Sequence, residues 1–312
     1  MRGYKGIILA GGTGSRLWPT TRVTSKQLMP VYDKPMIYYP LTTLMEAGLR
    51  DIAIITTPQD HSDYRDLLGD GAQWGIDLTY IAQPRPDGLA QAYLLADAYL
   101  DGAPSVLILG DNLFDVPQLP SVLRNAMARG AGATILGASV PDPERFGLAH
   151  VDTSGHVVLL EEKPQNPTTN TAVTGVYVCD ARATIWAKTL TPSARGELEI
   201  IDLLNLYLSA GALRLLKLPT DNAACWMDTG THDGLFSAAQ HVRSRQQATG
   251  DLIGSPDLTA YRQGWIEAQM LFDLADQMKT SGYGQALHQN LKRGQGGKAV
   301  ERPLQDSPAR AA

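Results

Sequence analysis

The sequence contains only two cysteines, Cys179 and Cys225, in 312 residues. Two cysteines cannot form a framework of several disulfides, and neither lies in a CxxC motif or in a Cys/His cluster with zinc spacing. The chain also lacks an excess of positive charge, because it has 27 Lys and Arg residues and 32 Asp and Glu residues, which gives a formal net charge of −5. This balance excludes a generally basic coat for nucleic acid. We therefore expect a protein of a reducing compartment.

Long apolar runs are absent as well, since none approaches the roughly 20 residues that a membrane-spanning helix needs. The apolar run Ile7–Ala10 is too short for the core of a signal peptide, and it leads directly into Gly11 and Gly12. We interpret it as the first strand and expect a cytoplasmic protein. Hydrophobic residues make up 44% of the chain and charged residues 19%. A chain of this length and composition can bury a large core.

The first half of the chain alternates short runs of Val, Ile and Leu with segments of helical period. Strands without polar alternation are buried on both faces, as in parallel sheets. Repeated strand–helix units of this kind predict an α/β fold with a doubly wound, mostly parallel sheet. We expect strands at 4–10, 51–57, 77–83, 105–109 and 133–140, and helices at 36–47, 59–68, 89–100 and 119–128.

After about residue 146 the strands become shorter, which favours an inserted substrate-binding region. Beyond residue 230 the pattern is helical, with expected helices at 232–247, 260–264, 266–278 and 283–291. Residues 293–312 have only Val300 and Leu304 as large apolar residues, so we expect a disordered tail there. We divide the chain into an α/β domain (1–250, with a first part at about 1–146 and a substrate-binding part at about 147–230), a helical region (251–292) and the tail.

A glycine-rich segment, GGTGSRLWP at 11–19, follows the first expected strand. Glycines there let the backbone approach a phosphate closely. A dinucleotide fingerprint needs a third glycine where Leu17 stands, and the GK[ST] of a Walker loop is absent. Two cations, Arg16 and Lys26, remain able to converge on one polyphosphate. The alternative is a tight turn with two solvated cations.

The stretches GGTGSRLWP and SKQLMPVYDKPMIYYPL (25–41) resemble the signature of sugar-nucleotidyltransferases, in particular of the long-form glucose-1-phosphate thymidylyltransferases. Further matches follow in the family's order at 83–92, 109–112, 146–147, 161–164, 172–175, 195–199 and 226–231. The resemblance covers roughly residues 4–292. It implies the Rossmann-like nucleotidyltransferase fold, with a nucleotide-binding part at about 1–146, a sugar-binding insertion at about 147–230 and a C-terminal helical appendage.

The resemblance also implies a nucleotide site. Arg16 and Lys26 resemble the catalytic cations that contact the triphosphate, and Gln83 resembles the residue that reads the base, since an amide can both donate and accept. Leu89 resembles a residue that helps to select deoxyribose. The nucleotide-binding residues expected in this way are Gly11, Gly12, Gly14, Ser15, Arg16, Lys26, Gln27, Gln83, Gly88 and Leu89.

Asp111 follows the expected strand at 105–109, at the carboxyl end where open α/β sheets bind ligands. Asp228 lies at the end of another apolar stretch. Two aspartates brought together by folding suit Mg²⁺, which takes a few carboxylates together with phosphate oxygens and waters. The resemblance implies that this pair holds the metal. The alternative is that Asp111 caps a helix and Asp228 forms a turn.

On the sugar-phosphate side, Lys163 resembles the catalytic lysine that holds the hexose phosphate, and Glu162 can accept hydrogen bonds from sugar hydroxyls. Further sugar-side positions by resemblance are Asn112, Gly147, Val173 and Trp226. Departures from the family pattern at Leu113, Thr171 and Ile201 leave the choice of sugar and the regulation open.

The resemblance implies a Mg²⁺-dependent enzyme that makes dTDP-glucose and pyrophosphate from dTTP and glucose 1-phosphate. The pathway would supply dTDP-rhamnose for polysaccharide biosynthesis. In this group the extra helices contribute to a homotetramer and to a second, allosteric site for feedback by the end product. The alternatives are the same chemistry with UTP or another sugar 1-phosphate, and a sensor of nucleotide sugars without catalysis. We expect neither a nucleic-acid nor a membrane partner.

Overall fold

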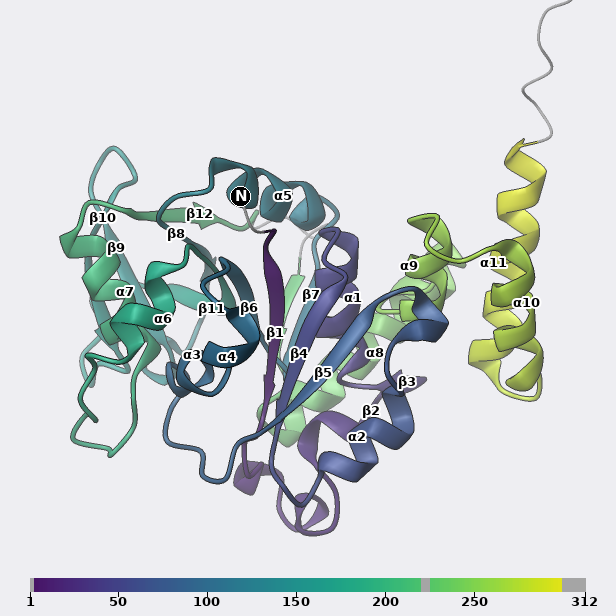
Figure 1. The fold of residues 1–312 in the computed structure, drawn as a ribbon, viewed down its shortest axis with the longest axis horizontal. Helices are drawn as coiled ribbons and strands as arrows, with labels where there is room; N and C mark the ends of the chain where they lie inside the picture. Colours follow the sequence, from purple (N-terminus) through teal and green to yellow (C-terminus); the bar gives the residue numbers. More distant parts are fainter. Residues whose placement is uncertain (1–2, 220–224, 299–312) are drawn as a thin grey trace, which may run out of the picture.

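The computed structural model describes residues 3–219 and 225–298 (Figure 1). Its centre is a nine-stranded sheet in the order β10-β9-β11-β6-β1-β4-β5, with β8 paired to β11 and β12 paired to β8. The strands are β1 (Lys5–Ala10), β4 (Asp51–Thr56), β5 (Asp77–Ala82), β6 (Ser105–Leu109), β8 (Ala133–Ser139), β9 (Gly147–Val151), β10 (Val157–Glu162), β11 (Thr171–Cys179) and β12 (Leu213–Lys217).

Strand pairing divides this sheet into two parts. The pairs β1–β4, β1–β6 and β4–β5 are parallel. In contrast, β11 runs antiparallel to β6, β8 and β9, and β9 runs antiparallel to β10. The sheet is therefore mixed and mostly parallel in the nucleotide-binding half, which confirms the expected α/β class. The antiparallel strands after residue 146 form the insertion.

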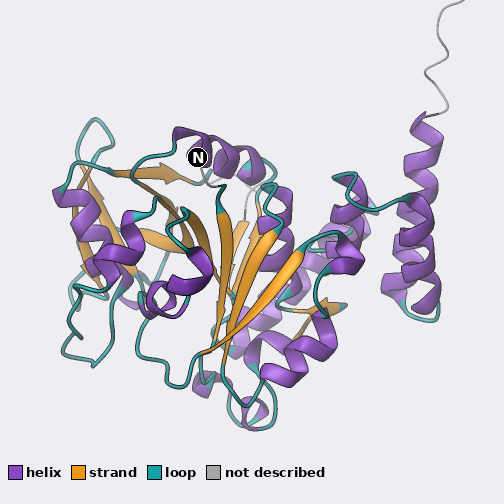
Figure 2. Ribbon diagram, in the orientation of Figure 1, coloured by secondary structure: helices purple, strands orange, loops and turns teal. Residues whose placement is uncertain are grey.

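Helices cover both faces of the sheet (Figure 2). Along β1, Ile8 faces one core and Ile7 and Leu9 face the other, because successive side chains of a strand point to opposite faces. The helices of the first face are α1 (Tyr38–Glu46), α2 (His61–Leu68) and α5 (Leu119–Arg129). Those of the second face are α3 (Gln91–Leu95), α4 (Asp97–Leu100), α6 (Arg182–Ala187) and α7 (Ile200–Ser209). This is the double winding that the sequence pattern predicts.

Two short sheets accompany the main one. Strand β7 (Asn112–Asp115) pairs antiparallel with β13 (Cys225–Asp228), and Asp228 lies opposite Asn112 in the register. Strand β2 (Pro30–Val31) pairs with β3 (Lys34–Pro35). Short 3-10 helices, η1 (Ser15–Leu17), η2 (Thr20–Arg22) and η3 (Lys26–Leu28), lie between β1 and β2. The pairing of β7 with β13 joins segments that are far apart in the sequence.

The C-terminal helices are α8 (His232–Thr249), α9 (Pro256–Arg262), α10 (Ala268–Gln277) and α11 (Gly282–Lys298). Helix α9 begins before the expected residue 260, because Ser255 caps it by accepting from Leu258 N and Pro256 occupies its first turn. Helix α11 includes residues 293–298, which we assigned to the tail, and Arg293 donates to Gly250 O at 2.8 Å. The expected tail at 299–312 lies outside the described residues.

Figure 1 shows α10 and α11 packed as a pair at the end of the molecule farthest from β9 and β10. The remaining short helices are η4 (Ala72–Trp74) and η5 (Pro143–Arg145). None of the helices in residues 3–219 and 225–298 has both the length and the apolar character that a membrane crossing requires.

Candidate active site

A cleft of about 530 Å³ opens at the carboxyl ends of β1 and β6 and extends toward β10 and β11. Residues expected from the sequence line it from both sides. On the nucleotide side these are Gly12, Gly14, Ser15, Arg16, Lys26, Gln27, Gln83, Gly88 and Leu89; on the sugar side they are Asn112, Gly147, Glu162, Lys163, Val173 and Trp226; Asp111 and Asp228 lie between them. The motifs therefore meet at one place.

Gly11 is the expected site residue that does not line the cleft. A Cβ atom at this position would lie 1.9 Å from Oε1 of Gln83. Glycine is needed here because any side chain would displace Gln83. Gly11 thus makes room for Gln83, and its expected contact with the nucleotide stays a prediction.

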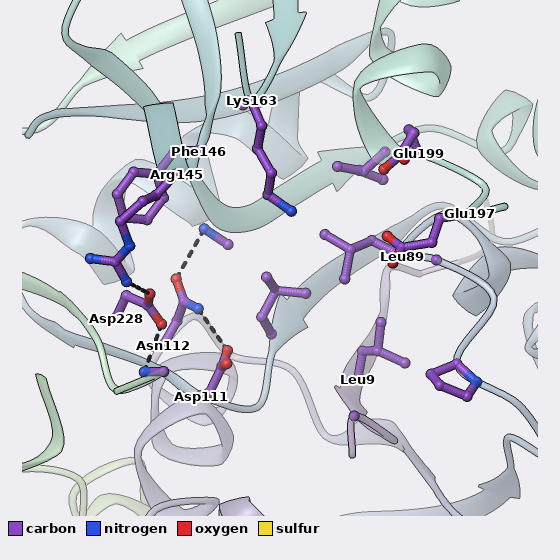
Figure 3. A pocket seen from close by; sticks show the side chains of 18 of the residues that line it. Leu9, Leu89, Asp111, Asn112, Arg145, Phe146, Lys163, Glu197, Glu199 and Asp228 are labelled. Carbon is purple, nitrogen blue, oxygen red and sulfur yellow. Dashed lines mark hydrogen bonds and ion pairs between the residues drawn. The ribbon is translucent and has the colours of Figure 1, made fainter. Parts of the chain in front are cut away.

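Asp111 and Asp228 come together through the β7–β13 pair. Thr229, directly after β13, donates its hydroxyl to Asp111 O at 2.7 Å and its backbone N–H to the same oxygen at 3.2 Å. Gly230 N donates to Asp228 Oδ1 at 2.9 Å, which orients that carboxylate. Figure 3 shows both aspartates on the same side of the cleft, with Lys163 across from them.

Asp111 forms a short ion pair inside the cleft. Lys26 Nζ lies 2.5 Å from Asp111 Oδ2, and Asn112 Nδ2 donates to Oδ1 at 3.0 Å. Burial alone would raise the pKa of Asp111, but Lys26, the Asn112 hydrogen bond and Arg16 outweigh burial and hold this pKa below its usual value. Asp111 is therefore kept ionised inside the cleft.

The pKa of Asp228 is shifted in the opposite direction to that of Asp111. Its pKa is raised by burial and, next, by the negative charge of Asp111, against the opposing effect of Lys26 and Arg16. Arg145 Nη2 lies 3.2 Å from Asp228 Oδ2. The repulsion between the two carboxylates is thus partly offset by Lys26, Arg16 and Arg145.

The donor set of this pair fits Mg²⁺. The ion prefers hard oxygen ligands and in nucleotide enzymes uses one or two carboxylates, with phosphates and waters completing its shell. Within residues 3–219 and 225–298 there is no group of three His, Cys, Asp or Glu side chains that would suit zinc or an all-protein cage. Two carboxylates at the open side of a cleft leave room for phosphate oxygens.

The sugar side is built on a second charge network. Arg195 donates to Glu199 at 2.8 Å and to Glu162 at 3.1 Å, and Lys163 Nζ lies 3.4 Å from Glu162. Burial raises the pKa of Glu162, with Glu199 adding to this effect and Lys163 and Arg195 opposing it. Lys163 has a φ of 43°, an uncommon backbone conformation for a residue other than glycine. Such strain at a cleft residue is typical of functional sites.

Asn112 is held by protein partners on both sides of its amide. Its Oδ1 accepts from Trp226 Nε1 at 2.6 Å and from Gly175 N at 3.1 Å. The ring of Trp226 packs edge-on against Phe146, with centroids 5.5 Å apart. Trp226 therefore lines the sugar side and also fixes the residue beside Asp111.

Gln83 and the loop 86–90 lie at the part of the cleft where the sequence predicts the base. Gly88 has a φ of 110°, and a Cβ atom there would lie 2.4 Å from the backbone of Leu198. Leu198 N donates to Asp87 O at 2.7 Å, and Ala90 N donates to Leu198 O at 3.1 Å. The loop thus lies against the segment that carries Glu197 and Glu199, and only glycine permits this close approach.

Comparisons with known proteins identify the family of this chain. The model of a family described as nucleotidyl transferase matches residues 5–245. The chain belongs to the nucleotidyl transferase family.

Curated relatives of this nucleotidyl transferase are named glucose-1-phosphate thymidylyltransferase. The one from Xanthomonas campestris pv. campestris (strain B100) is 51% identical over 290 residues, covering 93% of this chain and 98% of the relative. The one from Mycobacterium tuberculosis (strain H37Rv) is 44% identical over 289 residues, covering 93% and 99%.

Solved structures extend the comparison. A Bacillus anthracis structure described as a glucose-1-phosphate thymidylyltransferase in complex with a sucrose has a TM-score of 0.72 and 42% identity, covering 77% of this nucleotidyl transferase and 96% of that chain. A UDP-glucose pyrophosphorylase complexed with UDP-glucose shares the fold, with a TM-score of 0.66 at 22% identity.

The cleft of this nucleotidyl transferase also contains charged residues to which the sequence analysis gave no role. Arg195, Glu197 and Glu199 were visible only as the matched motif at 195–199. Arg145 directly precedes the matched pair Phe146–Gly147, but a single arginine after a proline-rich turn carries no signal by itself. Its place became apparent only with the β7–β13 pairing, which brings Asp228 within reach.

Proposed function

We propose that this nucleotidyl transferase makes dTDP-glucose and pyrophosphate from dTTP and glucose 1-phosphate. The observation that carries the proposal is the meeting, in one cleft, of two like-charged aspartates with Arg16, Lys26 and Lys163. This arrangement suits two highly charged phosphate substrates. The names of relatives that are 44–51% identical over 93% of the chain support the choice of substrates.

In the proposed reaction, a phosphate oxygen of glucose 1-phosphate forms a bond to the α-phosphorus of dTTP. The bond from that phosphorus to the bridging oxygen breaks, and pyrophosphate leaves with the electron pair. Since both substrates are anions, the protein must align them and neutralise the charge on the reacting oxygens. No covalent intermediate on the enzyme is needed.

The cleft residues divide this task. Arg16 and Lys26, on the nucleotide side, are proposed to hold the triphosphate, while Lys163 and Arg195 hold the sugar phosphate from the opposite wall. Asp111 and Asp228 are the proposed ligands of Mg²⁺, which supplies charge neutralisation on the phosphates when it is bound. Gln83 and the backbone near Gly88 are proposed to bind the base, with Gln27 and Leu89 near the nucleotide sugar.

A substrate panel tests the proposal. Purified protein is incubated with glucose 1-phosphate and, in turn, dTTP, UTP, CTP, ATP or GTP, and pyrophosphate release is followed with Mg²⁺ and with excess chelator. We expect a preference for dTTP, loss of release with chelator, and loss of release in Asp111→Ala. A preference for UTP or another sugar phosphate would assign the same chemistry to other substrates. Binding without metal-dependent release would instead indicate a sensor.

We further propose a cytoplasmic homotetramer that supplies dTDP-rhamnose synthesis and is inhibited by the end product. A second cavity, of about 330 Å³, supports a regulatory site. It lies between α1, α5 and α9, and its lining includes Arg124, Arg262, Glu46 and Gln263. Arginines suit a diphosphate. Inhibition by dTDP-rhamnose that is lost in Arg262→Ala, and the mass of the native particle, test these statements.

A further inference from the structure

The amide of Gln83 is buried at the base side of the cleft, and its orientation decides what the site can recognise. The side chain is 3% exposed. An amide has one face that donates and one that accepts, so a glutamine turned by 180° presents the opposite hydrogen-bonding character to a ligand. A residue that prevents this rotation determines which base is accepted.

The hydrogen bonds around Gln91 fix that orientation step by step. Gln91 lies in α3, four residues after Asp87, and one end of its amide is 3.1 Å from Asp87 Oδ2. An ionised carboxylate can only accept, so the end of Gln91 that faces it must be the NH₂ group. The other end, Oε1, then accepts from the Asp87 backbone N–H at 3.2 Å. The same N–H also donates to Arg85 O.

The same Oε1 of Gln91 faces Gln83 at 2.7 Å. Because this oxygen can only accept, the atom of Gln83 that meets it must be Nε2. Within residues 3–219 and 225–298, no group donates a hydrogen bond to the remaining atom, Gln83 Oε1, which lies beside Gly11. Gln83 is among the residues that line the cleft, so this unpartnered carbonyl oxygen is the amide atom that it can offer to a ligand there.

A carbonyl oxygen in this position selects bases by the character of the pyrimidine ring. Thymine and uracil carry an N–H donor at N3, whereas cytosine carries a bare acceptor there. A fixed acceptor accepts a hydrogen bond from N3 of thymine or uracil. It repels N3 of cytosine, because two facing lone pairs leave a buried polar group without a partner. Sites built around such a bond discriminate strongly against analogues that cannot form it.

We propose that Gln91 and Asp87 determine base selection by holding Gln83 with its carbonyl oxygen toward the N3 donor of the base. This inference rests on the proposed placement of the base at Gln83. Gln91 is a positioning residue, because it acts through Gln83 and does not line the cleft. The carboxylate of Asp87 and its backbone N–H together set the orientation of Gln91.

The test compares kcat/KM for dTTP and for dCTP, with glucose 1-phosphate and Mg²⁺, in a set of variants. In Gln91→Leu the Gln83 amide is free to rotate, and we expect the preference for dTTP over dCTP to fall by about tenfold or more.

The double variant Asp87→Asn with Gln91→Glu exchanges the carboxylate and the amide between positions 87 and 91. The carboxylate then at position 91 still accepts from Gln83, and the amide then at position 87 donates to that carboxylate. The preference should therefore return to within about threefold of the native value.

A matched control is available in α10, where Gln269 Nε2 donates to Asp273 Oδ1 at 2.8 Å across the same spacing of four residues, far from the cleft. Gln269→Leu should leave the dTTP/dCTP ratio unchanged. A Gln91→Leu variant that lowers kcat/KM equally for both nucleotides would show a merely structural role and overturn the proposal.

Gln83→Leu separates this inference from the proposed function. If Gln83→Leu removes the preference and Gln91→Leu does not, the base site stands and the role of Gln91 is refuted. If Gln83→Leu itself leaves the preference intact, the placement of the base at Gln83 fails, and the role of Gln91 fails with it.

Discussion

Two regions of the molecule bury charged side chains and use them differently. In the cleft, Lys26 pairs with Asp111 at 2.5 Å. In the seam between the α/β domain and the C-terminal helices, Lys34 pairs with Asp33 at 2.5 Å and donates to Gln246 Oε1 of α8 at 3.0 Å. Lys26 is 6% and Lys34 3% exposed, so burial does not distinguish them.

The difference lies in what surrounds each lysine. Lys34 lies over the rings of Tyr39 and Tyr283, at 5.2 and 5.5 Å, and burial lowers its pKa although Asp33 opposes this. Lys26 instead lines the open cleft. In the seam the polar groups bind one another, and in the cleft they face space that a ligand can enter. A buried Lys–Asp pair therefore stabilises the fold in the seam, whereas a pair of the same type in the cleft is available to bind substrate.

The largest effect is expected for the aspartates of the cleft. Asp228→Asn keeps the shape and the acceptor for Gly230 N but removes a charge from the proposed metal site. We expect kcat to fall by about 10³-fold, corresponding to about 4 kcal/mol, while the melting temperature changes little. Pyrophosphate release and thermal unfolding measure the two quantities. Retention of activity within about tenfold would show that Asp228 is not needed for the reaction.

Matched substitution of the two lysines sharpens the comparison. Lys26→Met should lower kcat by about 10²-fold or more. It should cost less unfolding free energy than Lys34→Met, because Arg16 still acts on Asp111 and the cleft is open to solvent. Lys34→Met leaves Asp33 without its cation and should destabilise the fold by about 3 kcal/mol, with kcat preserved at temperatures where the protein is folded. Urea unfolding and initial rates of both variants provide the readouts. Equal loss of stability in the two variants would remove the distinction between the regions.

A third test concerns the polar network of the seam around Asp257. This carboxylate accepts from Trp74 Nε1 at 3.0 Å and from the Tyr283 hydroxyl at 2.6 Å. Asp257→Ala leaves two buried donors without their acceptor, and we expect a loss of about 2–4 kcal/mol in unfolding free energy. Tyr283→Phe should cost less, about 1 kcal/mol. A fall in kcat of Asp257→Ala without loss of stability would contradict a structural role.

The smallest effect is expected at Glu46, at the end of α1, where burial raises the pKa to about 7, with Arg262 opposing and Asp115 and Asp251 adding to the increase. The folded protein then binds a proton more tightly than the unfolded chain does. The stability that this proton contributes is full below pH 4.5, the ordinary value, and is lost as the pH rises through 7.

Substitution isolates this contribution. Glu46→Gln cannot ionise, so its unfolding free energy should exceed that of the native protein more at pH 8 than at pH 5, by at most about 3 kcal/mol. Urea unfolding at the two pH values measures this difference. A difference of the opposite sign would show that Arg124 and Arg262 stabilise the ionised carboxylate more than burial destabilises it.

The sequence predicted the α/β class and most residues of the cleft, because glycine turns, buried strands and charged motifs are local signals. The resemblance predicted that Asp111 and Asp228 meet, but no local pattern predicted the pairing of β7 with β13 that brings them together from distant parts of the chain. Arg145 becomes meaningful only through that pairing. Likewise, Gln91 was visible only as part of a motif, since its effect depends on the direction of hydrogen bonds that no pattern records.

The most direct test of the division between cleft and seam is a crystal structure with dTDP-glucose and Mg²⁺. We expect the metal to contact Asp111 and Asp228, the diphosphate to lie between Arg16 and Lys163, and the base to lie against Gln83, with Lys34 and its partners unmoved. A product bound elsewhere, or a diphosphate away from both aspartates, would contradict the account.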